Sequence, residues 1–191
     1  MRALLVACAA ALALVALPSA DAKTACPAKW RAGWQTLANR ISAPVYCPTW
    51  MPNPLDAKIG GEFEDIYSIG KDRSYLVSFL EHGDLGSGDV HVNFRGYPGS
   101  TKIPRCPAPV GRGTVACFSE PVGHLTANGI KATVYQVNQG ADQWHILLAW
   151  HHQRSLYTVS EHVIAPYRFT TQVKRNLSRL LSTLVLVKPD A

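Results

Sequence analysis

The first 22 residues constrain this chain most, because they decide the redox conditions under which the rest of it folds. Arg2 gives a short positive start, an apolar run from Ala3 to Leu17 follows, and Pro18 ends it. Small residues from Ser19 to Ala22 then offer a cleavage site. We therefore predict that residues 1–22 are a cleaved secretory signal peptide. The mature chain is then secreted or held in the cell envelope.

Two other interpretations of this segment stay open. Leu5 to Cys8 resembles a lipoprotein cleavage box, in which Cys8 would carry a lipid, but too few residues precede it for both a basic and an apolar region. The run could also be retained as an anchor, although it is shorter than the ~20 apolar residues of a membrane span. Residues 23–191 are expected to form a single domain with its own core.

An even number of cysteines remains after cleavage, namely Cys26, Cys47, Cys106 and Cys117. In an oxidising compartment this predicts two disulfides. Of the three possible pairings we favour the local one, Cys26–Cys47 with Cys106–Cys117, and each bridge would add about 3 kcal/mol. A tetrathiolate zinc site is the alternative, but the chain has no Cys-x-x-Cys pair.

Apolar spacing predicts a helix at each end of the mature chain. After Pro27, the residues Trp30, Trp34, Leu37 and Ile41 gather on one helical face, and prolines then make residues 43–55 extended.

The second helix covers about 167–182 and buries a leucine-rich face. Arg168, Arg175 and Arg179 lie on its opposite side. This basic face is a candidate for binding an anionic surface such as lipid headgroups or an acidic polymer.

Between the helices, alternating patterns and turn residues predict antiparallel strands. Asn128-Gly129 is the strongest hairpin signal, since both residues tolerate a positive φ. The expected strands cover residues 64–69, 74–82, 90–95, 122–127, 130–138, 143–151 and 156–162, with a loop at 97–109. We predict an α+β fold: a twisted antiparallel sheet packed against the C-terminal helix, with the N-terminal helix stapled by a disulfide.

A two-residue turn at Gln153-Arg154 would pair the last two strands and set His145 opposite His162. With a third ligand, these imidazoles could bind Zn²⁺ or Cu²⁺, and they could titrate as a pair near neutral pH. His145 and His162 are therefore candidate metal ligands. His82 and His91 flank a Gly/Ser-rich turn whose spacing does not match a calcium loop.

Catalytic motifs are lacking. The sequence contains no Gly-x-Ser-x-Gly, His-Glu-x-x-His or phosphate-binding loop, and no mature cysteine is left over as a nucleophile. No catalytic residue and no cofactor is predicted. The formal net charge of +6 favours anionic partners, but its even spread and the absence of a reading motif argue against nucleic acid.

Packing residues in the C-terminal half carry one resemblance. They are Asn128-Gly129-Ile130, Leu147-Leu148-Ala149-Trp150, Leu156-Tyr157-Thr158-Val159, Leu177, Leu180 and Leu181. Residues 122–184 thereby resemble a domain of unknown function found in bacterial envelope and anti-sigma-associated proteins. The resemblance implies a sheet-and-helix domain on the outer side of the envelope, and it transfers no catalytic residue. This chain departs from that pattern in its two disulfides and in having no anchor after cleavage.

Together these observations predict a monomeric, non-catalytic binding or interaction domain. Its ligand would be apolar or anionic, and its partner an anionic lipid, an envelope polymer or an envelope protein. A secreted hydrolase that draws histidine and carboxylate groups from loops is the alternative.

Overall fold

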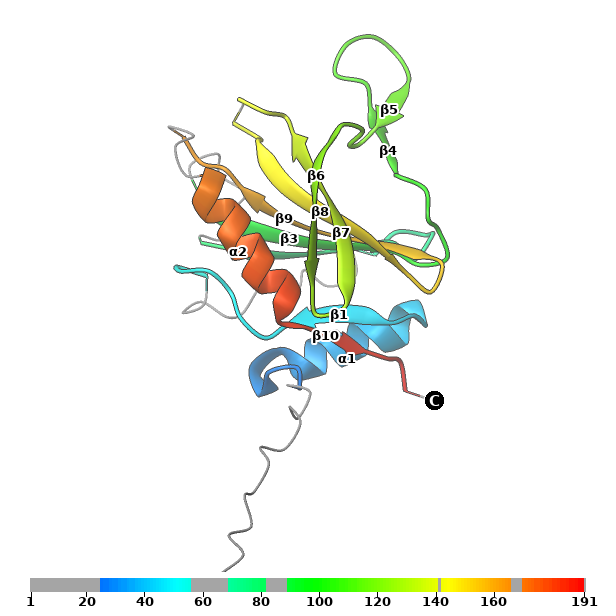
Figure 1. Cartoon of the computed structure of the whole chain (residues 1–191). Helices are drawn as coiled ribbons and strands as arrows, with labels where there is room; N and C mark the ends of the chain where they lie inside the picture. The colour runs from blue at the N-terminus through cyan, green and yellow to red at the C-terminus, as the bar shows by residue number, and fades with distance from the viewer. Residues whose placement is uncertain (1–24, 56–68, 82–88, 141, 166–169, 191) are drawn as a thin grey trace, which may run out of the picture.

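A computed structural model describes residues 25–55, 69–81, 89–140, 142–165 and 170–190, and Figure 1 shows their arrangement. These residues form two α-helices and ten strands. In chain order they are α1 (Ala28–Ile41), β1 (Val45–Pro48), β2 (Tyr75–Leu80), β3 (His91–Tyr97), β4 (Arg105–Pro107), β5 (Thr114–Ala116), β6 (Pro121–Ala127), β7 (Ile130–Val137), β8 (His145–His152), β9 (Ser155–His162), α2 (Thr170–Ser182) and β10 (Leu184–Val187).

The main sheet has six antiparallel strands in the order β2-β3-β9-β8-β7-β6. Strands β6 to β9 follow one another as a meander. The hairpin of β2 and β3 adds to this meander through the pairing of β3 with β9. This arrangement confirms the predicted α+β fold, in which an antiparallel sheet packs against a C-terminal helix.

Side chains of both helices pack against the same face of this sheet. In Figure 1, α2 crosses the sheet and α1 lies at its lower end beside β1 and β10. Trp30 and Trp34 of α1 meet Phe79 and Phe94 edge-to-face, with ring centroids 5.3 and 5.8 Å apart. Helix α2 contacts β9, β8 and β6 through its buried leucine-rich face. The main core therefore lies between the sheet and the helices.

A second small sheet pairs β1 with β10, strands that the sequence patterns did not predict. The proline-rich strap at 43–55 thus contains a strand, and another strand follows the last helix. The disulfide Cys26–Cys47 ties the start of α1 to β1, with Cα atoms 5.8 Å apart. The first and last described elements are therefore fastened to each other.

The face of the sheet turned away from the helices, called the far face here, carries a smaller apolar cluster around Phe118, Leu147 and Leu156. Beside it lies the segment 97–109, which was predicted as a loop but contains strand β4, paired with β5 in a short hairpin. The disulfide Cys106–Cys117 closes this hairpin, whose strands are largely exposed. In Figure 1 the hairpin projects from the body of the protein.

The two turns singled out in the sequence adopt the backbone that they require. Asn128 and Gly129 have φ of 50° and 72°, and Gln153 and Arg154 have φ of 45° and 63°. The second turn therefore forms without glycine or asparagine, and it fixes the register of β8 against β9. No helix among the described residues is long and apolar enough to cross a membrane.

Candidate functional site

Three histidines from three neighbouring strands meet on the far face of the sheet. The register pairs His145 of β8 with His162 of β9, as the turn at 153–154 predicted. His91 of β3 completes the group, with its ring centroid 4.8 Å from that of His145 and 4.5 Å from that of His162. His91 and His162 are buried, and His145 is partly exposed. These three residues are called the histidine cluster below.

Backbone carbonyls face three of the six ring nitrogens in the cluster. Nδ1 of His91 and Nδ1 of His162 lie 3.1 and 2.9 Å from the carbonyl oxygen of Asp89. Nε2 of His162 lies 2.6 Å from the carbonyl oxygen of Asp142. The remaining contact joins Nε2 of His91 to Nε2 of His145 at 3.1 Å. The cluster therefore connects the segments that precede β3 and β8.

Two of these imidazoles are held in the neutral form. Burial, with the neighbouring His162 as a second cause, lowers the pKa of His91 from 6.5 to about 4. Burial also lowers the pKa of His145 to about 3, with the neighbouring histidines adding to the effect. A hydrogen bond between the two Nε2 atoms needs one ring to donate and the other to accept, which two neutral rings can satisfy.

The geometry gives no support to a metal site on His145 and His162. Both nitrogens of His162 face carbonyl oxygens, and Nε2 of His145 points at another imidazole. A metal midway along that 3.1 Å contact would lie about 1.55 Å from each nitrogen, whereas a Zn–N bond needs about 2.0–2.1 Å. Among the described residues, no group of three or more His, Cys, Asp or Glu side chains is arranged to hold a metal ion.

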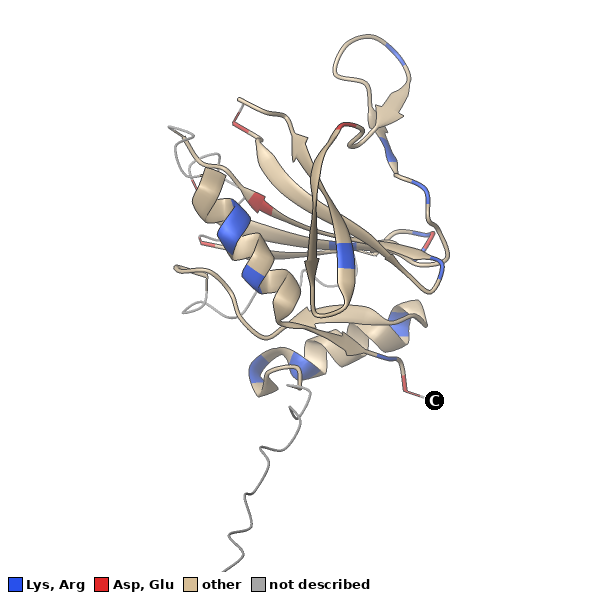
Figure 2. Ribbon diagram, viewed as in Figure 1, with Lys and Arg blue, Asp and Glu red and all other residues tan. Residues whose placement is uncertain are grey.

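The other residues predicted to bind or act lie elsewhere. His82 and Arg168 fall outside the described residues. Arg175 and Arg179 are exposed on the outer side of α2, where Figure 2 shows basic residues along the helix. The Arg179 guanidinium stacks on the ring of Trp50 at 4.2 Å, so the strap fixes one of the two arginines in place.

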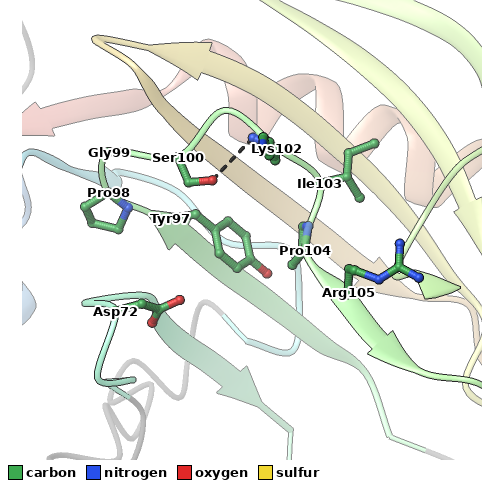
Figure 3. A pocket seen from close by; sticks show the side chains of 9 residues that line it. All are labelled: Asp72, Tyr97, Pro98, Gly99, Ser100, Lys102, Ile103, Pro104 and Arg105. Carbon is green, nitrogen blue, oxygen red and sulfur yellow. Dashed lines mark hydrogen bonds between the residues drawn. The ribbon is translucent and has the colours of Figure 1, made fainter. Parts of the chain in front are cut away.

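An open pocket of about 300 Å³ lies where β3 leaves the sheet (Figure 3). Tyr97 stands in the middle of it in that view, and Asp72, Lys102 and Arg105 lie around it. Prolines and the backbone of the β3–β4 connection form the rest of the wall. The lining residues are Asp72, Tyr97, Pro98, Gly99, Ser100, Lys102, Ile103, Pro104 and Arg105.

Hydrogen bonds fix this connection against the sheet. The amide of Leu156 donates to the carbonyl of Ser100, and the amide of Gly99 donates to Oγ of Ser155. Nε2 of His151 lies 3.0 Å from the carbonyl oxygen of Thr101. The pocket is therefore built on an anchored segment of backbone.

Charged groups of both signs surround the pocket. Burial raises the pKa of Tyr97, and the guanidinium of Arg95 partly offsets that effect. Hydrogen bonds from Ser74 lower the pKa of Asp72, so this carboxyl is ionised at neutral pH. Arg105 is oriented by Thr114 of β5, to which its guanidinium donates. The pocket thus combines an aromatic ring, two cations at its edge and one carboxylate.

Sequence reasoning missed His91 as a member of the cluster and missed the pocket. The pairing of β3 with β9 was not predictable from alternation alone, and without it His91 could not be set beside His162. A run of cations without acids, Lys102, Arg105 and Arg112 within residues 97–119, was the available signal for the pocket region.

Comparisons with protein-family models, curated proteins and solved structures find no match for this chain.

Proposed function

We propose that this protein is an extracytoplasmic binding domain for an anionic ligand, and that the pocket around Tyr97 receives it. One observation carries the proposal: Lys102 and Arg105 lie at the edge of an open hollow that surrounds a tyrosine ring. The two disulfides support a location in an oxidising compartment.

The charges favour a ligand with one anionic group. The segment 97–119 carries three cations and no acid, and Figure 2 shows its basic residues along the connection and the hairpin. An arginine with a fixed guanidinium is well suited to a phosphate or carboxylate. Asp72 on the other side repels a second anion and accepts hydrogen bonds. The best fit is a small phosphate or carboxylate that also bears hydroxyl groups, including the end of an anionic polymer.

Two alternatives have less support. An apolar ligand between helix and sheet would have to displace side chains of the main core, which fill that interface. A hydrolase would need free histidine nitrogens, whereas those of His91 and His162 are already engaged within the histidine cluster.

The arginine face of α2 adds a second, weaker attraction to anions. Each basic residue near an anionic membrane contributes about 1 kcal/mol, so Arg175 and Arg179 alone would give only slight adsorption. We therefore assign specific binding to the pocket.

A titration followed by amide NMR tests the proposal. Glycerol 3-phosphate, with inorganic phosphate as the simpler probe, should shift the amide signals of residues 99–105 saturably. Arg105→Ala and Lys102→Ala should each weaken binding about two- to fivefold at low salt, as expected for exposed charges. Lys174→Ala on α2 is the matched control and should leave the affinity unchanged. The pocket would be ruled out if millimolar probe causes no amide shifts. It would also be ruled out if Lys174→Ala weakens binding as much as the two pocket variants do.

A further inference from the structure

The contacts of His162 demand two donors from one ring. Its Nδ1 lies 2.9 Å from the carbonyl oxygen of Asp89 and its Nε2 lies 2.6 Å from that of Asp142. A carbonyl oxygen only accepts hydrogen bonds, and a neutral imidazole has one N–H. Both contacts are hydrogen bonds only when the ring carries a proton on each nitrogen, which makes it a cation.

The other two rings then have a single consistent arrangement. Nδ1 of His91 donates to the same carbonyl of Asp89, which has a second lone pair to accept it. The neutral His91 therefore accepts at Nε2, and the donor is Nε2–H of His145. This assignment leaves Nδ1 of His145 without a proton, and that atom is buried with no hydrogen-bond partner among the described residues.

We propose that the histidine cluster holds one positive charge, on His162, and fastens the segments before β3 and β8 to each other only while that charge is present. Without the second proton, one nitrogen of His162 would set its lone pair against a carbonyl oxygen. One of the two segments would then lose its attachment. The cluster is thus a proton-dependent fastener at one end of the sheet, and it works independently of the pocket.

Charged residues of both signs lie near the histidine cluster. Asp89 and Asp142 supply the two carbonyls and belong to the fastened segments. Glu81 follows β2 and accepts a hydrogen bond from the amide of Val90. Arg95 of β3 is the opposing charge and acts on His145. Of these acidic residues, Asp89 acts electrostatically on the cluster, where its charge favours the protonated form of His91.

Electrostatic repulsion limits the cluster to a single positive charge. His91 and His145 lie with their ring centroids 4.5 and 5.2 Å from that of His162. If His91 or His145 also became protonated, two cations would lie at this separation away from water, where their repulsion is strong. The fastener therefore has two limits: it opens when His162 loses its proton, and it is strained when a second ring gains one.

Ring-nitrogen NMR of the wild-type protein, labelled with ¹⁵N, tests the charge directly. In mildly acidic buffer both nitrogens of His162 should show the shift of a protonated nitrogen, while His91 and His145 each keep one unprotonated nitrogen. An unprotonated nitrogen on His162 under these conditions would overturn the proposal. This measurement needs no variant, so it stands even if substitutions prevent folding.

Amide hydrogen exchange tests the fastening. Val90 donates to Glu81 and Val163 donates to the carbonyl of Trp144, so these amides report on the two segments. Glutamine lacks the two opposed ring nitrogens of histidine and cannot donate to both carbonyls. His162→Gln should therefore speed the exchange of the Val90 and Val163 amides about tenfold. His124→Gln, at an exposed histidine, is the control and should leave the exchange rates of both amides unchanged. Unchanged exchange of these two amides in His162→Gln would contradict the proposal.

Discussion

Asn176 of α2 donates a hydrogen bond of 2.7 Å to Oε1 of Glu161 on β9, deep between the helix and the sheet. Glu161 is only 3 % exposed, and its Oε2 has no hydrogen-bond partner among the described residues. Burial raises the pKa of this carboxyl to about 8, which the bond from Asn176 partly opposes. The group is therefore protonated at neutral pH, and the fold contains a titratable site beneath α2.

Glu161→Gln should stabilise the protein above pH 4.5. The carboxyl ionises near 4.5 in the unfolded chain and near 8 in the folded one, so the free energy of unfolding falls as the pH rises between these values. Between pH 4.5 and 8 each pH unit costs about 1.4 kcal/mol, so the substitution should recover on the order of 5 kcal/mol at the upper end. Urea unfolding across this range, with Glu120→Gln as an exposed control, checks it. Equal pH slopes for wild type and variant would contradict the assignment.

The histidine cluster should destabilise the protein in acid. The pKa values of His91 and His145 lie near 4 and 3 when folded and near 6.5 when unfolded, so below pH 6.5 the unfolded chain binds protons that the folded chain does not. The free energy of unfolding should fall with decreasing pH, by up to about 1.4 kcal/mol per unit for each ring. Together with Glu161 this places a stability maximum near pH 6.5. A free energy of unfolding that stays constant from pH 6.5 down to pH 4 would contradict this prediction.

Gly96→Ala should disrupt the pairing of β2 with β3. A Cβ at position 96 would lie 2.2 Å from Cε1 of Tyr75, whose ring is buried and cannot move aside freely. We expect a loss of about 1–3 kcal/mol, as for other overpacked sites. Gly123→Ala on the edge strand β6 is the matched control, because nothing lies within 4 Å of its Cβ. Thermal unfolding of both variants makes the comparison, and equal melting temperatures would argue against this contact.

Loss of the first disulfide should lower the stability of the whole fold, whereas loss of the second should affect only one hairpin. Cys26 and Cys47 are buried in the main core, so replacing both by alanine should lower the global stability by about 3 kcal/mol. Cys106 and Cys117 close a largely exposed hairpin, so serine at both positions should loosen β4 and β5 while the main core stays intact. Hydrogen exchange mapped along the chain distinguishes these outcomes. Global unfolding of the Cys106/Cys117 variant at ordinary temperature would contradict this division.

Local patterns predicted the elements that local physics determines. The aromatic spacing of α1, the leucine face of α2 and the positive-φ pair Asn128-Gly129 each depend on residues close in sequence. The same holds for the turn at 153–154, and through it for the pairing of His145 with His162.

Pairings between strands that are far apart in sequence could not be predicted from local patterns. His91 joins the cluster only because β3 pairs with β9, and the strands β1 and β10 are too short to show an alternation of their own. The pocket was missed for a similar reason. Its wall is an irregular connection whose shape depends on hydrogen bonds to Ser155 and Leu156, far along the chain.

The pairing of β1 with β10 also sets an order of events. Because synthesis runs from the N-terminus, α1 and β1 are made first, yet the strand that completes their small sheet is made last. The bridge between Cys26 and Cys47 needs only a short loop and can close early. The bridge of β1 to the start of α1 therefore does not require β10, whereas the small sheet does. A shortened chain that ends before residue 184 should keep that bridge and still leave one side of β1 unpaired.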